Sequence, residues 1–584
     1  MTRPLPYRPA FVLLALAAVA PAAAAGTAIV RTTPPEAAVD AVFARYDSKD
    51  TPGCSVAVID GGKVLLEKSY GMADPSLGVP RTSRTSHWIP YSEARVFVAL
   101  AVAMLARDGN ITLDDPIRQH IPQLPAYASA VTVRQLLHHR SGLADYLVLD
   151  PAGDSMWTRV SEDEFFRVLA RWNKLGFAPG TERMYSNTDY ALLRLLVERV
   201  TGGSLDAYLR TRMFEPLGMH STRVGSDQAL GVPGHALFHH DTPNGYRRVL
   251  GYRLSPVGGI AVSTSLDDVL RWERGLRDPS RGFGALLEQL EVGAPPPAQG
   301  ESGEAFAFGV HRRTVDGMAL VEFRGISGYT WLVRAPNQGL SVATLCNAYP
   351  GMDTYAERVA TVFAGKQAAG GDAAGASSAS PVASTSAVAP PVQAPPPRAV
   401  PVDVPLADLQ RYVGQYRDEG GVRVNAAIVD GKLVVTPRGR PSFVGVIPLG
   451  DGRFSTETPY DLFFAPGSDG VMRLNSRDRL TGEPGADELR RVEVAGPTAE
   501  TARGYAGTYV GDELEIVLHV RADGDTVLMA ARGMAEVAIT PETEKDTFRL
   551  PDTYTARFER DGAGKVVALV LDANRLKGMR FSRQ

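Results

Sequence analysis

The sequence predicts an α+β domain followed by two small antiparallel β-barrels. Three observations lead to this fold class. Strand-like segments stand at both ends of residues 35–365 with helical segments between them, a stretch rich in Ala, Ser and Pro follows, and the remaining residues repeat themselves. The chain of 584 residues also exceeds the ~250 to 300 residues at which a single core stops growing, so several domains are expected.

The N-terminus has the pattern of a secretory signal peptide. Two arginines precede an apolar run over residues 11–19, and Ala23 and Ala25 supply the small residues before a cleavage site. The run is shorter than the ~20 residues that span a bilayer, so a signal cleaved after residues 1–25 is favoured over an anchor. We therefore expect an exported protein without a membrane span after cleavage, either periplasmic or secreted, from a Gram-negative bacterium.

The domain expected over residues 35–365 begins and ends with paired strands. Its strands are predicted at 54–59, 64–67, 329–334 and 340–346, and its helices at 92–108, 131–139, 161–173 and 188–200. Strands at both ends predict that the first and last strands share one sheet. If these two strands pair antiparallel, Cys54 lies near Cys346. The two cysteines then form either a disulfide or a pair of small buried apolar side chains.

The remaining chain is a linker and a duplication. Residues 366–402 have the Ala, Ser, Gly and Pro content of a semi-extended linker. The tyrosine motif Y-V-G-Q-Y at 412–416 returns 93 positions later as Y-A-G-T-Y at 505–509. Short alternating segments between Asp-Gly turns predict antiparallel strands, and therefore a barrel over 403–495 and another over 499–584.

The composition excludes one class of partner. The formal net charge is -3, and no run dense in Lys and Arg provides the basic field that nucleic acid binding requires. We expect no nucleic acid partner. The oligomeric state and the role of the barrels are left open.

A serine stands at the N-terminal end of the helix predicted over residues 92–108. The segment W-I-P-Y-S-E-A-R ends with Ser92 and, one turn further, Arg95. A serine at a helix N-terminus suits a nucleophile, because the helix dipole favours negative charge there, but it also suits a simple N-cap. A second segment, P-G-T-E-R-M-Y-S-N, brings Tyr185 and Asn187 to the start of another helix, where they also fit as core and cap.

The order of motifs along residues 35–365 resembles that of the penicillin-recognising serine hydrolases. The family order is S-x-x-K, L-D-D-P, L-L-x-H-x-S-G-L, P-G-x-x-x-x-Y-S-N, S-P-x-G-G and a final strand ending in Asn. The matching segments here are residues 92–95, 113–116, 136–143, 179–187, 255–259 and 345–347. This family includes class C β-lactamases, D-aminopeptidases and related esterases, and the repeats resemble the lipocalin-like barrels of D-aminopeptidases.

The resemblance implies roles for three residues. Ser92 would be the acyl nucleophile, Tyr185 the general acid and base, and Asn187 a partner that binds substrate or a side chain. His139 matches a position that we interpret as structural. The resemblance also implies a small ester or peptide substrate, with neither a cofactor nor a metal ion.

Two departures from the family pattern put the chemistry in question. The family lysine is Arg95 here, and a guanidinium with a pKa near ~13.8 cannot accept the proton of Ser92. The third family motif, H-x-G or K-T-G, falls within V-E-F-R-G-I-S-G-Y, where Glu322 or Phe323 takes the place of the basic residue. We expect Glu322 and Gly325 to line the substrate site, with Glu322 repelling the carboxylate of a penicillin and favouring a free amine.

Two hypotheses follow from these residues. In the first, Tyr185, its pKa lowered by Arg95, deprotonates Ser92, and an ester or amide is cleaved through an acyl-enzyme. In the second, the protein is an inactive relative that binds a cell-envelope peptide or protein. A true β-lactamase is disfavoured in both.

Overall fold

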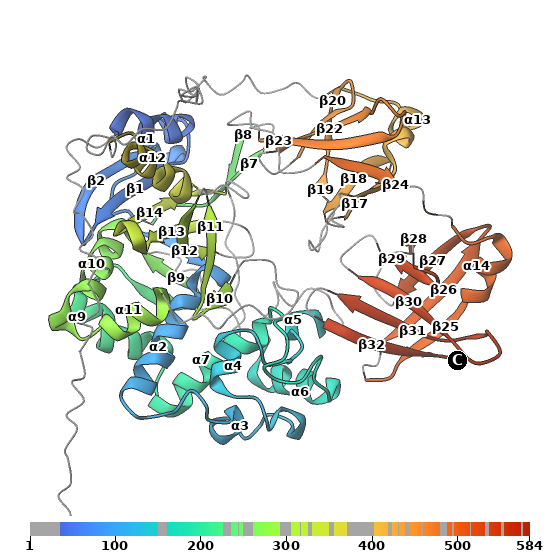
Figure 1. Ribbon diagram of the computed structural model, residues 1–584, viewed down its shortest axis with the longest axis horizontal. Coiled ribbons are helices and arrows are strands. Elements are labelled where there is room, and N and C mark those ends of the chain that lie inside the picture. Colours follow the sequence, from blue (N-terminus) through green and yellow to red (C-terminus); the bar gives the residue numbers. More distant parts are fainter. Residues whose placement is uncertain are drawn as a thin grey trace, which may run out of the picture.

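Figure 1 shows the computed structural model of the chain. The expected signal peptide and residues 371–401 of the expected linker lie outside the described residues. The structure describes residues 35–149, 160–225, 235–242, 245–248, 261–291, 305–315, 317–324, 330–349, 355–370, 402–417, 423–429, 431–437, 444–456, 460–478, 488–492, 494, 496–513, 516–531, 536–542, 544–550, 554–573 and 576–584.

The first domain is built on a seven-stranded sheet in which the two ends of the domain meet. The order is β10-β11-β12-β13-β14-β1-β2, and every neighbouring pair is antiparallel. The predicted pairing of the first strand with the last is therefore confirmed. The strands are β1 (Cys54–Asp60), β2 (Lys63–Tyr70), β10 (Ala305–Ala307), β11 (Val310–Val315), β12 (Met318–Arg324), β13 (Thr330–Ala335) and β14 (Leu340–Cys346).

Helices from the beginning and the end of the domain sequence pack against this sheet. The first helix, α1 (Glu36–Phe43), packs against the last, α12 (Tyr355–Gly370), which contacts β13 and β14 (Figure 1). The helix α10 (Leu266–Arg277) contacts β1 and β14. Because α12 ends at Gly370, it extends into the segment expected to be linker.

The middle of the domain is helical, as predicted. The helix α2 (Arg95–Arg107) is buried from Arg95 to Leu105, which explains why its sequence is apolar all round. It packs against α7 (Asn187–Thr201), which in turn contacts α4 (Val133–Leu137). The other described α-helices of this domain are α3 (Ile117–His120), α5 (Tyr146–Leu149), α6 (Glu162–Trp172), α8 (Leu205–Leu209), α9 (Glu215–Leu217) and α11 (Gly284–Glu291).

Three small sheets border the seven-stranded one. They have the orders β3-β4, β5-β9-β6 and β15-β7-β8. Their strands are β3 (Met72–Asp74), β4 (Val79–Pro80), β5 (His87–Pro90), β6 (Arg223–Gly225), β7 (His239–Thr242), β8 (Gly245–Arg248), β9 (Ala261–Thr264) and β15 (Ala348–Tyr349).

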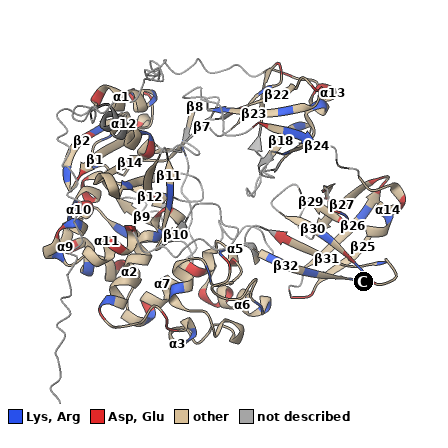
Figure 2. Ribbon diagram, viewed as in Figure 1, with Lys and Arg blue, Asp and Glu red and all other residues tan. Residues whose placement is uncertain are grey.

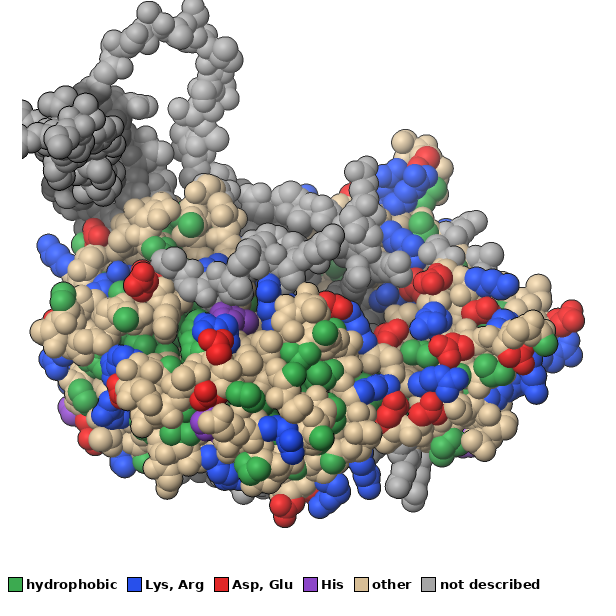
Figure 3. Space-filling view, turned by 60° about the horizontal axis from the view of Figure 1, so that its bottom comes forward, with side chains coloured by type: hydrophobic (Ala, Val, Ile, Leu, Met, Phe, Trp, Pro, Cys, Tyr) green, Lys and Arg blue, Asp and Glu red, His purple; other side chains and the backbone are tan. Residues whose placement is uncertain are grey.

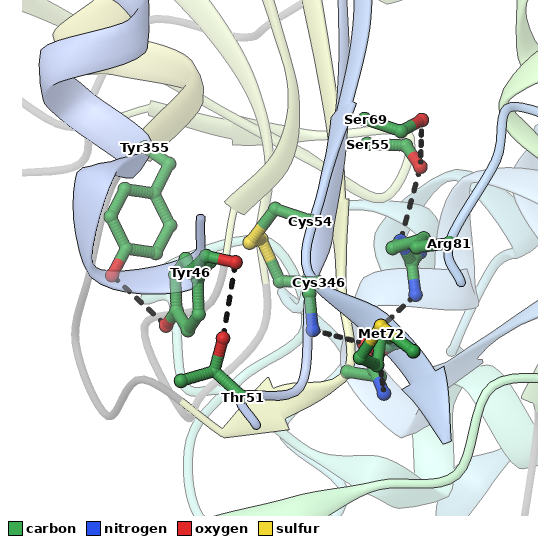
Figure 4. Close-up of a disulfide and its surroundings, with 11 residues drawn as sticks. Tyr46, Thr51, Cys54, Ser55, Ser69, Met72, Arg81, Cys346 and Tyr355 are labelled. Atoms are coloured by element: carbon green, nitrogen blue, oxygen red, sulfur yellow. Dashed lines mark hydrogen bonds between the residues drawn. A yellow bond between two sulfur atoms is a disulfide. The ribbon is translucent and has the colours of Figure 1, made fainter. Parts of the chain in front are cut away.

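A disulfide joins the first and last strands of the sheet. Cys54 and Cys346 are directly opposed in the register of β1 and β14, and their sulfur atoms are bonded (Figure 4). The next residue, Asn347, is fully buried, and its side chain accepts from the Gly53 N–H at 2.9 Å and from Arg81 at 3.0 Å. The Asn that ends the last strand therefore ties neighbouring loops together beside the disulfide.

The second repeat is a closed eight-stranded barrel, as predicted. Its first strand pairs with its last, and α14 (Ala499–Tyr505) precedes it. The strands are β25 (Gly507–Gly511), β26 (Val517–Asp523), β27 (Thr526–Ala531), β28 (Val537–Pro541), β29 (Thr547–Arg549), β30 (Thr555–Arg560), β31 (Val566–Ala573) and β32 (Leu576–Arg583).

The first repeat has the same strand order but is an open nine-stranded sheet. Here the counterpart of β28 is split at Val446 into two short strands, of which one pairs with β18 and the other with β21. The elements are α13 (Leu406–Leu409), β16 (Gly414–Arg417), β17 (Arg423–Val429), β18 (Lys432–Pro437), β19 (Val444–Gly445), β20 (Ile447–Gly450), β21 (Arg453–Ser455), β22 (Tyr460–Pro466), β23 (Met472–Asp478) and β24 (Leu489–Val492).

The repeated tyrosine motif performs the same structural task in both copies. The Tyr416 hydroxyl donates to the Tyr412 carbonyl oxygen at 2.7 Å, and the Tyr509 hydroxyl donates to that of Tyr505 at 2.6 Å. All four tyrosines are buried. The duplication detected in the sequence is therefore also seen in the structure, where each repeat has the same buried pair of tyrosines joined by the same hydrogen bond.

The closed barrel contacts the first domain. Its buried apolar residues join the core of that domain, whereas the first repeat has a core of its own. Lys174 of the first domain pairs with Glu513 and donates to the Gly578 carbonyl oxygen at 2.8 Å. Lys577 pairs with Glu182 at 3.0 Å, close in sequence to Tyr185.

Charges of both signs are mixed over the described elements (Figure 2). A space-filling view shows Lys, Arg, Asp and Glu side chains scattered over the face that it presents (Figure 3). Among the described helices, none combines the length and the apolar character that crossing a membrane requires.

Candidate active site

Ser92 lies in a short 3₁₀ turn, Tyr91–Ala94, that leads directly into α2. The sheet stabilises this turn, because the Trp331 indole N–H on β13 donates to the Glu93 carbonyl oxygen at 3.0 Å. Gly309, between β10 and β11, fits closely against the start of α2: a Cβ atom there would lie 2.7 Å from the Val96 nitrogen, and its φ is +80°. The sheet thus fixes the place of Ser92, which is only 3% exposed.

The structure brings four of the predicted site residues together. The Ser92 Oγ lies 2.7 Å from the Tyr185 hydroxyl oxygen and 3.1 Å from the Arg95 Nη2. The same Arg95 nitrogen donates to the Asn187 Oδ1 at 3.2 Å. Residues from two distant segments of the chain therefore share one hydrogen-bond network at the adjoining ends of α2 and α7.

The chemistry of the guanidinium fixes the direction of the hydrogen bonds that Arg95 makes. A guanidinium has only N–H donors, so the Ser92 Oγ accepts from Arg95, while its own proton can be donated toward the Tyr185 oxygen. Tyr185 in turn donates to the Asn187 Oδ1 at 3.5 Å. With Tyr185 donating to Asn187, the Tyr185 oxygen can accept the proton of Ser92.

The orientation of the Asn187 amide is equally well defined. Its oxygen faces Arg95, and its Nδ2 donates to the Asp145 Oδ2 at 2.7 Å. A donor-only group on one side and a carboxylate on the other permit a single orientation of the amide. Asn187, the first residue of α7, is thus a bridge between the cation and a buried acid.

Arg95 is buried among aromatic rings. Its guanidinium carbon lies 4.2 Å from the centre of the Tyr185 ring and 5.2 Å from that of Tyr190, and the residue is 3% exposed. Contacts of this kind between a cation and a ring contribute about 0.5 to 2 kcal/mol. The cation is thus held against the tyrosine that it is expected to influence.

His139 supports this tyrosine from a buried position, in agreement with the structural interpretation. The His139 ring lies 4.8 Å from the Tyr185 ring, and its Nδ1 is 2.9 Å from the Asp189 Oδ2. The other oxygen of Asp189 accepts from the Ser141 hydroxyl at 2.5 Å. Burial raises the pKa of Asp189 well above its ordinary value.

Glu322 does not join this network. It lies in β12 as a fully buried residue, and its Oε2 is 2.8 Å from the Arg313 Nε and 3.7 Å from the Arg324 Nε. A carboxylate paired in this way is neutralised within the protein, so its placement gives no support to a role in substrate binding. Gly325 and residues 255–259 lie outside the described residues.

Two functional candidates escaped the sequence analysis. Asp145 and Asp189 are both fully buried beside the site, and both follow motifs that had been recognised for other reasons. Asp189 follows Asn187 by two residues, and this spacing alone does not show that the Asp189 carboxylate lies beside the Ser92 network. Asp145 directly precedes α5 and its Oδ1 accepts from the Leu147 N–H, so its sequence position suggests an ordinary N-cap and gives no sign of a link to Asn187.

Comparison with known proteins places this geometry in a family. The sequence profile of the family described as Beta-lactamase matches residues 39–365. The chain is 30% identical over 255 residues to a D-aminopeptidase of Brucella anthropi, covering 41% of this chain and 46% of the relative. It is 25% identical over 279 residues to Protein flp of Staphylococcus aureus, covering 44% and 52%.

The fold also has a match among solved structures. The octameric penicillin-binding protein homologue from Pyrococcus abyssi aligns with a TM-score of 0.50 at 20% sequence identity, covering 85% of this chain and 97% of that one. The present chain spans about half the length of the curated relatives that it matches. With more than half of its residues in the matching region, the chain belongs to the Beta-lactamase family.

Proposed function

We propose that this protein is a serine hydrolase of the esterase or D-amino-acid amidase and peptidase type, acting through an acyl-enzyme on Ser92. The observation that carries the proposal is the position of the Ser92 Oγ, which is 2.7 Å from the Tyr185 oxygen while accepting from Arg95. A nucleophile and a base within hydrogen-bond reach, with a third group that orients them, is the arrangement that acyl transfer needs.

The reaction proceeds in two balanced steps. Tyr185, once it has lost to solvent the hydroxyl proton that it donates to Asn187, takes the proton of Ser92 as Oγ bonds to the substrate carbonyl carbon, and the adjacent Arg95 cation offsets the phenolate charge. Tyr185 then returns that proton to the leaving alcohol or amine as the bond to it breaks. Water, deprotonated by Tyr185, attacks the acyl-enzyme, and Ser92 leaves with the proton.

The substrate class is part of the same proposal. Similarity to a D-aminopeptidase over 255 residues supports a peptide or amide with a D-amino acid. The expected repulsion of penicillin by Glu322 has lost its basis, because Arg313 neutralises that carboxylate. Residues 1–25 support the further proposal that the protein is exported and meets its substrate in the periplasm or outside the cell.

The alternative remains an inactive relative that binds a cell-envelope peptide or protein. Arg95 favours it, because the lysine that serves as a base in the family is absent. The two functions differ in one measurable property, the reactivity of Ser92.

The test is covalent labelling of the purified full-length protein. A fluorescent fluorophosphonate, a fluorescent penicillin, a p-nitrophenyl ester and a pair of D- and L-alanine p-nitroanilides are compared in the native protein and in Ser92→Ala. Ser280→Ala, which alters an exposed turn, is the matched control. We expect a fluorophosphonate adduct and turnover of ester or D-anilide in the native protein and the control, and loss of both in Ser92→Ala. Absence of any Ser92-dependent adduct or turnover would overturn the hydrolase proposal in favour of the binding module.

A further inference from the structure

Arg95 presents an electrostatic problem that the family lysine does not. A lysine in a buried site can lose its proton and become neutral, whereas an arginine keeps its charge at every accessible pH. Arg95 is 3% exposed. A permanent cation with so little access to water requires a buried anion that keeps its charge as well.

Two fully buried aspartates lie beside Arg95, and their surroundings differ. The oxygens of Asp189 are occupied by the Ser141 hydroxyl and the His139 ring, and burial raises its pKa well above the ordinary value. The oxygens of Asp145 accept from the amide of Asn187 at 2.7 Å and from the Leu147 N–H at 3.1 Å. Asp145 is therefore linked to Arg95 through a single amide, that of Asn187, whereas the hydrogen bonds of Asp189 lead to other side chains.

We propose that Asp145 is the counter-charge of Arg95 and a positioning residue for Ser92, and that it acts through Asn187. The carboxylate holds the Asn187 Nδ2, which turns the amide oxygen toward Arg95 at 3.2 Å. The same Arg95 nitrogen then meets the Ser92 Oγ at 3.1 Å. The positioning role rests on the proposed function, whereas the counter-charge does not.

The backbone around Asp145 is held independently of its carboxylate. The Thr188 hydroxyl, next to Asn187, donates to the Ala144 carbonyl oxygen at 2.6 Å and accepts from the Tyr146 N–H at 2.9 Å. These bonds secure the turn on both sides of residue 145. Asp145→Asn therefore removes the charge while the turn stays attached to α7, and Thr188→Val loosens the turn while the charge stays.

The first experiment measures the rate of fluorophosphonate labelling from pH 6 to pH 10. For Asp145→Asn we expect a labelling rate at least about 10-fold lower, because Asn187 no longer holds Arg95 in contact with the Ser92 Oγ. We also expect the midpoint of the pH profile to move down by about half a unit to one unit, since an anion that opposes the Tyr185 phenolate is gone. Thr188→Val should lower the Tm with the midpoint unchanged. A rate and midpoint equal to those of the native protein would refute the positioning role.

The second experiment needs no activity. Urea unfolding is compared for the native protein, Asp145→Asn, Arg95→Met and the double variant. If the two charges balance each other, each single variant unfolds at a lower urea concentration, and the double variant unfolds at no lower concentration than the weaker single variant. Additive losses would refute the counter-charge. A native protein that no probe labels would refute the proposed function and with it the positioning role, while this comparison would still decide the counter-charge.

Discussion

Two buried arginines in the first domain solve the same electrostatic problem in different ways. Arg334 in β13 is fully buried, lies against the rings of Trp272 and Phe323, and is paired directly with Glu273, at 3.0 Å from its Nε. Arg95 also lies against two aromatic rings, and its Nη2 contacts the Ser92 hydroxyl and the Asn187 amide, which links it to the Asp145 carboxylate. The direct pair secures the fold, while the indirect one leaves a donor directed at a nucleophile.

The largest effect is expected where the pairing is direct. Glu273→Gln leaves the Arg334 cation buried without its anion, so the free energy of unfolding should fall by about 3 to 5 kcal/mol. Urea unfolding measures the loss. The control is Asp114→Asn, which breaks an exposed pair with Arg134 and should leave the free energy of unfolding almost unchanged. Equal losses in the two variants would show that the buried pair has no special weight.

A fall in pH should destabilise the protein by protonating His138, a buried histidine. Burial lowers the pKa of His138 to about 4, while an unfolded histidine binds its proton near pH 6.5. As the pH falls from about 6.5 to about 4, the unfolded state takes up this proton first, so the free energy of unfolding decreases by about 1 to 3 kcal/mol and then levels off. The measurement is urea unfolding as a function of pH.

The control for this pH dependence is a pair of histidine variants. His138→Asn should show a shallower decrease between pH 6.5 and 4, because the titrating group is gone. His220→Asn, at an exposed position, should follow the native protein. An unchanged slope in His138→Asn would assign the acid sensitivity to other buried groups such as His87 and His311, whose pKa values burial also lowers.

The smallest effect on stability is expected at the indirect pair. Arg95→Lys keeps the positive charge and loses the contacts with the tyrosine rings, so the free energy of unfolding should fall by about 1 kcal/mol. Its effect on reactivity is larger, since a lysine can lose its proton and the labelling of Ser92 should then depend on one more titrating group. A labelling profile identical to that of the native protein would show that the charge at this position does not act on Ser92.

The sequence predicted well what depends on local pattern. The strands that begin and end the first domain, the helices between them and the closed second barrel all follow from periodicity, turns and the repeat. The meeting of Ser92, Arg95, Tyr185 and Asn187 followed from the order of motifs that resembles the family.

What the sequence could not supply depends on contacts between distant segments. Glu322 was expected to line the substrate site, but its environment is decided by Arg313 on the neighbouring strand β11, for which no element had been predicted. Asp145 becomes relevant only when its turn is packed against α7. The first repeat is open because its strand is divided at Val446 into two short strands with different partners. The similarity between the two repeat sequences gives no sign of this division.

The disulfide imposes an order of assembly on the chain. Cys54 and Cys346 are 292 positions apart, and the residues of the Ser92 network all lie between them. At a synthesis rate of about 5 to 20 residues per second, the second cysteine follows the first by roughly 15 to 60 s. During that interval β1 has β2 beside it but lacks β14, so one edge of the nascent hairpin is open to wrong partners. Closure of the sheet therefore comes late, after every residue of the Ser92 network has been made.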